Sequence, residues 1–240
     1  MTELHLKDHQ VVSRPKWLED RKRLLAKEKE LTRLSDELSA ERRKLPWVRV
    51  EKKYVFEGPG GSQTLADLFD GRSQLIVYHF MFGPDWEEGC PSCSMAADHF
   101  DSSVLHLQQR DVTLIAVSRA PFPKIEAFKK RMGWQFKWVS SYGNAFNHDF
   151  RVSFTQEEMA KGKYYNFDTS DFPSEEAPGI SVFYKAETGD IFHTYSSHAR
   201  GGEPLLGVYF HLDLVPKGRD EAALPWPMAW VRHHDKYDQR

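Results

Sequence analysis

The segment from Gly89 to Ser94 constrains this chain more than any other, because it holds the only two cysteines of the sequence at C-x-x-C spacing. The apolar run 75–82 before it is rich in β-branched and aromatic residues, which predicts a buried strand. After it, apolar residues recur at helical spacing from Ala96 to Leu107, without an internal glycine or proline. The predicted order is strand, loop, cysteine pair, helix.

This order predicts a reactive thiolate. Cys90 is expected at the cap of the helix, with Pro91 at the first position, where a missing N–H costs nothing. Free amides and the positive end of the helix dipole lower the pKa of a thiol placed there to roughly 3.5–7.5. Cys93, one turn further along, is expected to form a disulfide with Cys90 after a mixed disulfide forms. The acidic segment 85–88 acts in the opposite direction, because nearby carboxylates raise the pKa of a thiol.

Besides redox chemistry, two other interpretations of the cysteine pair remain open: metal binding and inert thiols. The same spacing supplies half of a structural zinc site, but a closed site would need distant ligands because the sequence has no second pair. Soft thiolates also suit copper(I), and Cys90, Cys93 and a distant histidine, His193 or His198, would form such a site. Inert buried thiols are the third interpretation. The redox interpretation itself needs no cofactor and no metal.

Composition limits the remaining function classes. With 240 residues, of which 40% are hydrophobic, the chain is expected to form one domain with appendages. A net charge of -2 indicates no general attraction to nucleic acid or to an anionic membrane. No apolar run is long enough to span a bilayer, and residues 1–8 lack the features of a signal peptide, so a cytoplasmic location is expected. In that reducing compartment a lone cysteine pair is more often catalytic, sensing or metal-binding than structural.

Residues 1–46 are expected to form an N-terminal helical arm. A cap-like Ser13 precedes a segment rich in Lys, Arg, Glu and Leu that ends at Pro46. A narrow apolar seam repeats every seven residues at Trp17, Leu24, Leu31, Leu38 and Leu45. The helix is expected either to lie across its own domain or to grip a second subunit, which would give a homodimer.

Residues 47–215 are expected to form the domain that carries the cysteines. Strands are predicted at 48–50, 54–56, 112–118 and 136–139, helices at 64–69, 91–109, 123–132 and 205–212, and a hairpin at 180–195. The aromatic-rich insertion 140–178 is either a satellite packing cluster or a wall over the cysteine site. The tail 216–240, with Trp226 and Trp230, is expected to pack on the domain or on a partner chain.

These elements carry a resemblance to a known family. A βαβ unit with C-x-x-C at its helix start, followed by a helix, a hairpin and a final helix, is similar to the α/β thioredoxin fold, and the lead-in 64–82 resembles its peroxiredoxin-type version. More narrowly, segments 80–94, 193–196, 212–220 and 228–232 resemble the signature of a bacterial thioredoxin-like family catalogued as domain of unknown function 899. The resemblance spans nearly the whole chain. It implies a dithiol–disulfide oxidoreductase in which Cys90 attacks an oxidised thiol or disulfide, Cys93 resolves the adduct and a cellular dithiol system recycles the pair.

The chain also departs from these relatives. Thioredoxins place a cis-proline opposite the cysteines, just before the strand of the hairpin; Pro178 comes close to that position here, but Gly179 and Ile180 intervene. Gly89 occupies the position of the usual thioredoxin tryptophan, with Trp86 nearby, and Glu87 stands where peroxiredoxins carry Thr or Ser. Glu87 counts against thiol peroxidase activity, which stays a further alternative together with a non-catalytic dimeric scaffold. The residues expected to support the cysteine pair are Pro91, Ser92, Trp86 and Pro178.

Overall fold

The computed structural model describes residues 10–238, so residues 1–9 of the predicted arm and 239–240 of the predicted tail lie outside it. The chain divides into two compact units, Met1–Pro46 and Trp47–Arg240. In the first unit, α1 (Arg14–Arg42) is a single helix of 29 residues that buries none of its side chains. Ser13 caps it by accepting a hydrogen bond from the Lys16 amide, and Pro15 lies in its first turn. The long helix predicted for this segment is confirmed.

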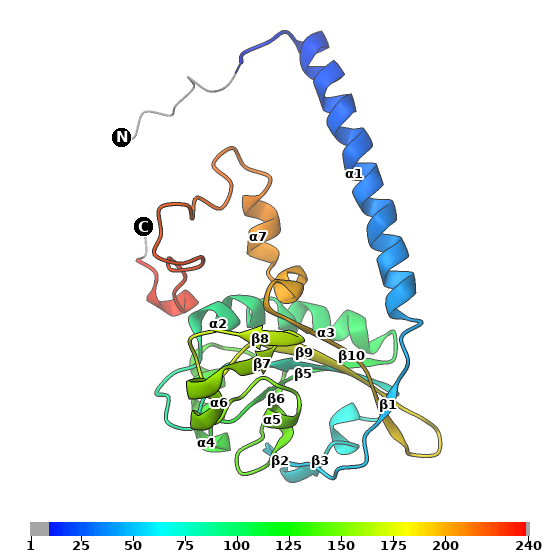
Figure 1. Ribbon diagram of the computed structural model, residues 1–240, viewed down its shortest axis with the longest axis vertical. Helices are drawn as coiled ribbons and strands as arrows, with labels where there is room; N and C mark the ends of the chain where they lie inside the picture. Colours follow the sequence, from blue (N-terminus) through cyan, green and yellow to red (C-terminus); the bar gives the residue numbers. More distant parts are fainter. Residues whose placement is uncertain (1–9, 239–240) are drawn as a thin grey trace. The chain divides into compact units, whose positions relative to one another are not determined.

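The second unit is built on a mixed sheet (Figure 1). Its eight strands within the described residues are β1 (Val48–Arg49), β2 (Val55–Gly58), β3 (Gly61–Thr64), β4 (Gln74–His79), β5 (Val112–Ser118), β6 (Lys137–Ser140), β9 (Gly179–Lys185) and β10 (Ile191–His198). They lie in the order β1-β10-β9-β4-β5-β6-β2-β3. A separate two-stranded sheet contains β7 (Lys163–Tyr165) and β8 (Asp168–Ser170).

The centre of the sheet has the predicted thioredoxin-like arrangement. Strands β4 and β5 are parallel and adjacent, while β9 is antiparallel to β4 and forms the predicted hairpin with β10. The helical elements of this unit are η2 (Asp67–Phe69), α2 (Pro91–Ala97), α3 (Phe100–Gln108), α4 (Phe122–Arg131), α5 (Phe146–Asp149), α6 (Gln156–Lys161), η3 (Ala199–Leu205), α7 (Gly207–Leu212) and η4 (His234–Lys236). The α/β, thioredoxin-like fold class is confirmed by this order of elements.

Successive side chains along each strand point to opposite faces of the sheet, and both faces are apolar at its centre. In β4, Tyr78 points to one face, where it packs with side chains of α2, α3 and α4. Leu75 and Val77 point to the other face, which is covered by η2 and by the aromatic side chains around α5. Burial on both faces explains why β4 and β5 appear as nearly continuous apolar runs in the sequence.

The helix predicted over 91–109 is interrupted. Helix α2 ends at Ala97 and α3 begins at Phe100, because the His99 amide bonds back to Ala96 in a tight turn. The Asp98 carboxylate at this turn accepts a hydrogen bond from Trp134 Nε1 (2.8 Å) and contacts His234 Nδ1 (2.7 Å). Both partners are distant in the sequence, which is why periodicity alone did not reveal the break.

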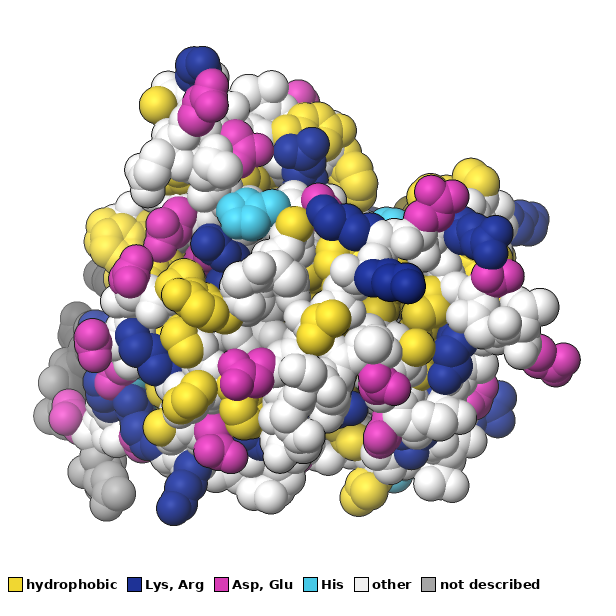
Figure 2. Space-filling model, turned by 90° about the horizontal axis from the view of Figure 1, so that it is seen from below, with side chains coloured by type: hydrophobic (Ala, Val, Ile, Leu, Met, Phe, Trp, Pro, Cys, Tyr) yellow, Lys and Arg dark blue, Asp and Glu magenta, His cyan; other side chains and the backbone are white. Residues whose placement is uncertain are grey.

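The surface of the molecule is mixed in charge. On the face shown in Figure 2, acidic and basic side chains are interspersed, with apolar side chains between them. Among residues 10–238, no helix combines the length and the apolar character needed to cross a bilayer.

Candidate functional site

The cysteine pair lies at the amino end of α2, where the loop from β4 meets the helix. Cys90 is the N-cap residue and Pro91 occupies the first turn. The backbone anchors this position, because the Cys90 amide donates to the Met81 carbonyl (3.0 Å) and the Cys90 carbonyl accepts from the Ser94 amide (2.9 Å). Both cysteines are free thiols, with Cys90 partly exposed and Cys93 only 2% exposed.

The surroundings give the two thiols opposite acidities. A hydrogen bond from Cys93, with further ones from the Cys93 and Ser92 amides and the Ser92 side chain, outweighs burial and lowers the pKa of Cys90 to about 7. Burial raises the pKa of Cys93 well above its usual value, and the neighbouring Cys90 adds to this effect. Cys90 is therefore the sulfur that ionises first, and Cys93 holds its proton and donates it as a hydrogen bond.

Tyr78 extends this chain of hydrogen bonds into the sheet. Its buried side chain lies on the same face as the cysteines, and its hydroxyl interacts with the Cys93 sulfur, which lowers the pKa of Cys93 against the effect of burial. Burial and the two cysteines in turn raise the pKa of Tyr78 well above its usual value. The hydroxyl therefore stays protonated and remains a donor toward Cys93.

Long-range contacts neutralise Glu88, the last residue of the acidic segment before the cysteines. Glu88 forms ion pairs with Arg131 (2.6 Å) and Lys236 (2.7 Å), and these cations lower its pKa. Glu87 is exposed to solvent. The predicted upward effect of this segment on the thiol does not dominate, because hydrogen bonds from Cys93 and Ser92 outweigh the other contributions at Cys90.

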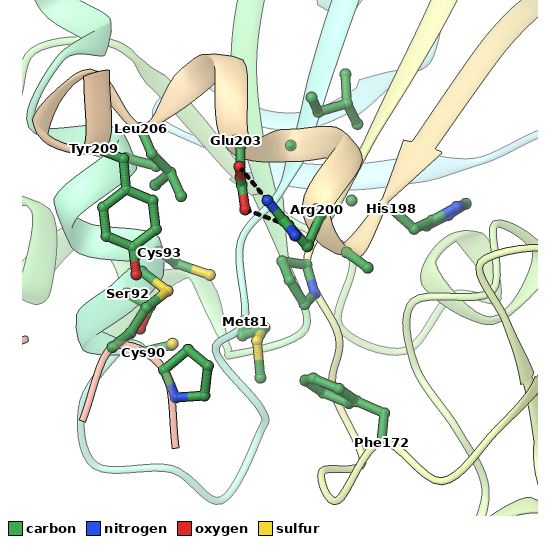
Figure 3. A pocket seen from close by; sticks show the side chains of 18 of the residues that line it. Met81, Cys90, Ser92, Cys93, Phe172, His198, Arg200, Glu203, Leu206 and Tyr209 are labelled. Atoms are coloured by element: carbon green, nitrogen blue, oxygen red, sulfur yellow. Dashed lines mark hydrogen bonds and ion pairs between the residues drawn. The ribbon is translucent and has the colours of Figure 1, made fainter. Parts of the chain in front are cut away.

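A cavity of about 680 Å³ opens beside the cysteines. Figure 3 shows Cys90, Ser92 and Cys93 together at one side of it, with Leu206 and Tyr209 above them and Met81 and Phe172 further along its wall. The insertion 140–178 serves two purposes. Phe146 packs in the core on the other face of the sheet, whereas Phe172 lines the cavity.

The supporting residues predicted from the sequence occupy different places. Pro178 and Ser92 line the cavity, and the Pro178 carbonyl accepts a hydrogen bond from the Tyr165 hydroxyl (2.7 Å). The peptide bond before Pro178 is trans. Trp86 lies in the loop before the cysteines but is not part of the cavity wall, and its indole N–H donates to Glu175 (3.2 Å).

The structure brings neither candidate metal-binding histidine to the cysteine sulfurs. His193 lies opposite Phe183 in the hairpin, on the sheet face that points away from Tyr78 and the cysteines. His198 lies opposite Gly179, and its ring is turned away from the two sulfurs (Figure 3). Within residues 10–238, no group of three or more His, Cys, Asp or Glu side chains is arranged to hold a metal ion.

The C-terminal tail completes the site, a role that the sequence did not reveal. Trp226, Pro227 and Met228 line the cavity. Further along, the buried His233 side chain contacts the Gly89 carbonyl through Nε2 (2.7 Å), directly before Cys90. The only sequence signal for this arrangement is the concentration of large apolar side chains in a segment without helical or strand periodicity.

Comparisons with known proteins match the chain to one family model and to several solved structures. The family model described as "Bacterial protein of unknown function (DUF899)" matches residues 6–237. Peroxiredoxin Q of Xanthomonas campestris is similar in structure, with 14% identity, a TM-score of 0.45 and coverage of 64% of this chain and 85% of that chain. Peroxidoxin BcpB of Mycobacterium tuberculosis has 12% identity, a TM-score of 0.45 and coverage of 68% and 94%. No protein of curated function matches the chain.

Proposed function

The chain belongs to the DUF899 family of bacterial proteins, and from that premise we propose that it is a thiol–disulfide oxidoreductase that works through Cys90 and Cys93. The family match confirms the resemblance drawn from segment 80–94 and the three shorter segments. One observation carries the proposal. A partly exposed thiol with a lowered pKa faces a cavity, and a buried second thiol donates a hydrogen bond to it.

In the proposed reaction each sulfur has a step of its own. The Cys90 thiolate attacks one sulfur of a substrate disulfide, and the other substrate sulfur leaves as a thiolate that takes up a proton. Cys93 then loses its proton and attacks the Cys90 sulfur of the mixed disulfide. This step closes the Cys90–Cys93 disulfide and releases the second substrate thiol. Two electrons pass from the cysteine pair to the substrate in each cycle.

The oxidised pair must be reduced before the next cycle. An external dithiol supplies the two electrons by the same exchange in reverse, attacking the disulfide at the partly exposed Cys90. We place this reaction in a reducing compartment such as the cytoplasm, where a lone cysteine pair serves catalysis or sensing more often than structure.

Trapping the mixed disulfide tests this assignment. In a Cys93→Ser variant the resolving thiol is gone, so a disulfide substrate should remain attached to Cys90. Intact-protein mass spectrometry under non-reducing conditions measures the adduct as an added mass, which dithiothreitol should remove.

The Cys90→Ser variant is the matched control. It leaves only the buried Cys93, which should react at least about tenfold more slowly because burial raises its pKa. Equal labelling of both variants, or no adduct on Cys93→Ser while its Cys90 still reacts with iodoacetamide, would contradict the assignment.

The other functions considered have less support from the geometry. A thiol peroxidase would use the same Cys90, but Glu87 at the position of the peroxide-orienting hydroxyl is an exposed carboxylate. A metal-binding role would need a third ligand, but His193 lies opposite Phe183, and the ring of His198, which lines the same cavity, is turned away from the sulfurs. A scaffold without catalysis does not require the pKa values of Cys90 and Cys93 to differ.

A further inference from the structure

The cavity beside Cys90 has a mainly apolar wall that comes from several parts of the chain. Its apolar side chains come from the loop after β4, the segment before β9, β9 itself, the segment before α7, and the tail, and they include Met81, Phe172, Ile180, Leu206, Trp226 and Met228. A volume of about 680 Å³ falls within the range of sites that enclose small molecules. The sulfur that attacks therefore faces a space suited to an apolar group of limited size.

The charged side chains in the cavity wall are already paired with one another or with near neighbours. Glu203 binds Arg200 (2.7 Å), a contact drawn with dashed lines in Figure 3. Its carboxylate also lies 3.4 Å from the Arg219 guanidinium. Arg219 also binds Asp213 (2.8 Å) and stacks over the Tyr209 ring at 3.9 Å. These pairs balance in charge, so they offer no excess charge to a ligand.

The acceptor Glu221 in the same wall is also engaged. Its Oε1 accepts hydrogen bonds from the Tyr209 hydroxyl (2.8 Å), from Trp230 Nε1 (2.6 Å) and from the Met228 amide (3.0 Å). Another wall hydroxyl, that of Tyr165, donates to the Pro178 carbonyl and accepts from the Ala199 amide (2.9 Å). Glu221 and Tyr165 thus hold the wall together rather than face a ligand.

The tail segment of the wall is fixed at both ends. Before Trp226, Glu221 accepts a hydrogen bond from the Tyr209 hydroxyl of α7, and after Trp226 the His233 side chain contacts the Gly89 carbonyl. Val231 is buried between these points with Met95 and Tyr209. The cavity is therefore a built feature of the domain, and the tail narrows the approach to Cys90.

From this cavity we infer the substrate class: a small, uncharged disulfide whose sulfur atoms carry bulky apolar groups, such as aromatic rings. This inference rests on the proposed oxidoreductase function. The dithiol of Cys90 and Cys93 and the substrate disulfide yield two apolar thiols and the Cys90–Cys93 disulfide, with two electrons transferred. A folded protein is a poor substrate, because a peptide group that enters an apolar cavity without a hydrogen-bond partner loses its hydration without compensation.

A pair of matched small disulfides tests the charge preference. Dipyridyl disulfide is neutral, and its dicarboxylate analogue, dithiodinicotinate, has the same ring system with a negative charge on each ring. In single-turnover mixing with the reduced protein, the second-order rate for the neutral compound should exceed that for the charged one by more than about tenfold, because an unpaired carboxylate would have to leave water. The ratio is taken relative to that of free dithiothreitol, which corrects for the intrinsic reactivity of the two compounds.

Variants of the wall connect this preference to the cavity. Trp226→Glu places a charge on the wall at a side chain that is already 63% exposed, and should lower the rate for the neutral disulfide about tenfold or more, whereas Trp226→Phe should retain it. Phe172→Glu makes the same test from the segment before β9. Leu214→Glu is the control of equal charge, since Leu214 is 84% exposed and is not part of the wall, and its rate should stay at the wild-type value.

The outcomes separate this inference from the function on which it rests. The substrate class is wrong if the ratio of the rates for the neutral and the charged disulfide equals the ratio found with free dithiothreitol. It is also wrong if the protein reduces insulin as fast as it reduces dipyridyl disulfide. In both cases the oxidoreductase function stands. If Trp226→Glu and Phe172→Glu both behave as Leu214→Glu does, the cavity does not select the substrate. If no disulfide of any kind reacts with the cysteine pair, the proposed function itself fails.

Discussion

At the level of single residues, a short chain of hydrogen bonds decides which sulfur ionises first. Tyr78 donates toward Cys93, and Cys93 donates toward Cys90. Each donor lowers the pKa of the next sulfur, while burial raises it, and the balance favours ionisation only at the partly exposed end. The sequence spacing alone makes the two cysteines neighbours, but it does not make them different.

Removing the Tyr78 hydroxyl should slow the resolution of the mixed disulfide by Cys93 and spare the first attack by Cys90. In Tyr78→Phe, Cys93 loses the hydrogen bond that stabilises its thiolate, so its pKa should rise further. A hydrogen bond to a charged group contributes about 1.5–3 kcal/mol, so resolution of the mixed disulfide should slow by roughly ten- to hundredfold. Rapid acid quenching and mass spectrometry follow the lifetime of the adduct.

The rate at which the Cys90 thiolate is alkylated by iodoacetamide, with release of iodide, provides the control for Tyr78→Phe. It should change by less than about threefold, because the hydrogen bonds that lower the pKa of Cys90 come from Cys93 and Ser92 rather than from Tyr78. A variant in which both rates fall together would show that Tyr78 supports the structure of the site as a whole rather than the acidity of Cys93.

Gly89, directly before the nucleophile, is required by close packing. A Cβ atom at this position would lie 2.6 Å from Phe80 Cε1 and 2.9 Å from Phe128 Cε1. Gly89→Ala should therefore lower the free energy of unfolding by about 1–3 kcal/mol, as overpacking does in other cores. Urea denaturation measures the change. Gly60→Ala is the control, because its nearest contact would be Gln63 Nε2 at 3.8 Å, and it should change stability by less than about 1 kcal/mol.

At the level of elements, helix α1 has an apolar seam without a partner in its own unit. Trp17, Leu24, Leu31, Leu38 and Leu45 repeat every seven residues and are all exposed. The seam is symmetric about Leu31, so an antiparallel pair of helices would place segment 21–29 opposite segment 33–41 of a second copy. Basic residues predominate in the first segment and acidic residues in the second. This complementarity supports the predicted homodimer as a proposal.

Association through α1 can be tested at its centre. Leu31→Glu would bring two carboxylates together at the symmetry axis, so the dissociation constant of the dimer should rise by more than about tenfold. Sedimentation velocity over a range of concentrations measures it. Leu105→Glu, which changes an exposed leucine of α3, is the matched control and should leave the dimer intact. A wild-type protein that sediments as a monomer at every concentration would rule out the proposal.

At the level of the whole molecule, two buried titratable groups give stability opposite dependences on pH. Burial and the nearby His198 and His193 lower the pKa of His79 to about 3. Burial raises the pKa of Glu176 to about 7, although Ser153 and Arg119 act against it. His79 therefore stays neutral in the folded protein, while the unfolded chain binds a proton below pH 6.5, so its contribution to stability falls as the pH falls from 6.5 towards 3. Glu176 keeps its proton in the folded protein, so its contribution falls as the pH rises from 4.5 to 7.

Replacing each group should change the pH dependence of unfolding in opposite directions. Between about pH 5 and pH 6, His79→Gln should make the slope of the unfolding free energy against pH more negative by ~1.4 kcal/mol per unit. Glu176→Gln should make the same slope more positive by a similar amount. Urea titrations at several pH values measure both slopes. Slopes equal to that of the wild type would mean that the pKa of neither group differs between the folded and the unfolded protein.

The sequence by itself determined the elements that depend on local pattern. Strands β4 and β5, the hairpin of β9 and β10, helix α1 and the position of Cys90 at the start of α2 follow from periodicity, caps and turn residues, which act over a few positions. These features predicted the order of elements on which the resemblance to the thioredoxin fold rests, and they led to the proposal that Cys90 is the nucleophile.

Only the tertiary structure decided what distant segments do to one another. Trp134 and His234 hold the break at Asp98, and Trp226 reaches the cavity beside Cys90 from the far end of the chain. The strand register turns the His198 ring away from the sulfurs. Such contacts depend on packing and hydrogen bonds between residues that are neighbours in space alone, and no local spacing in the sequence encodes them.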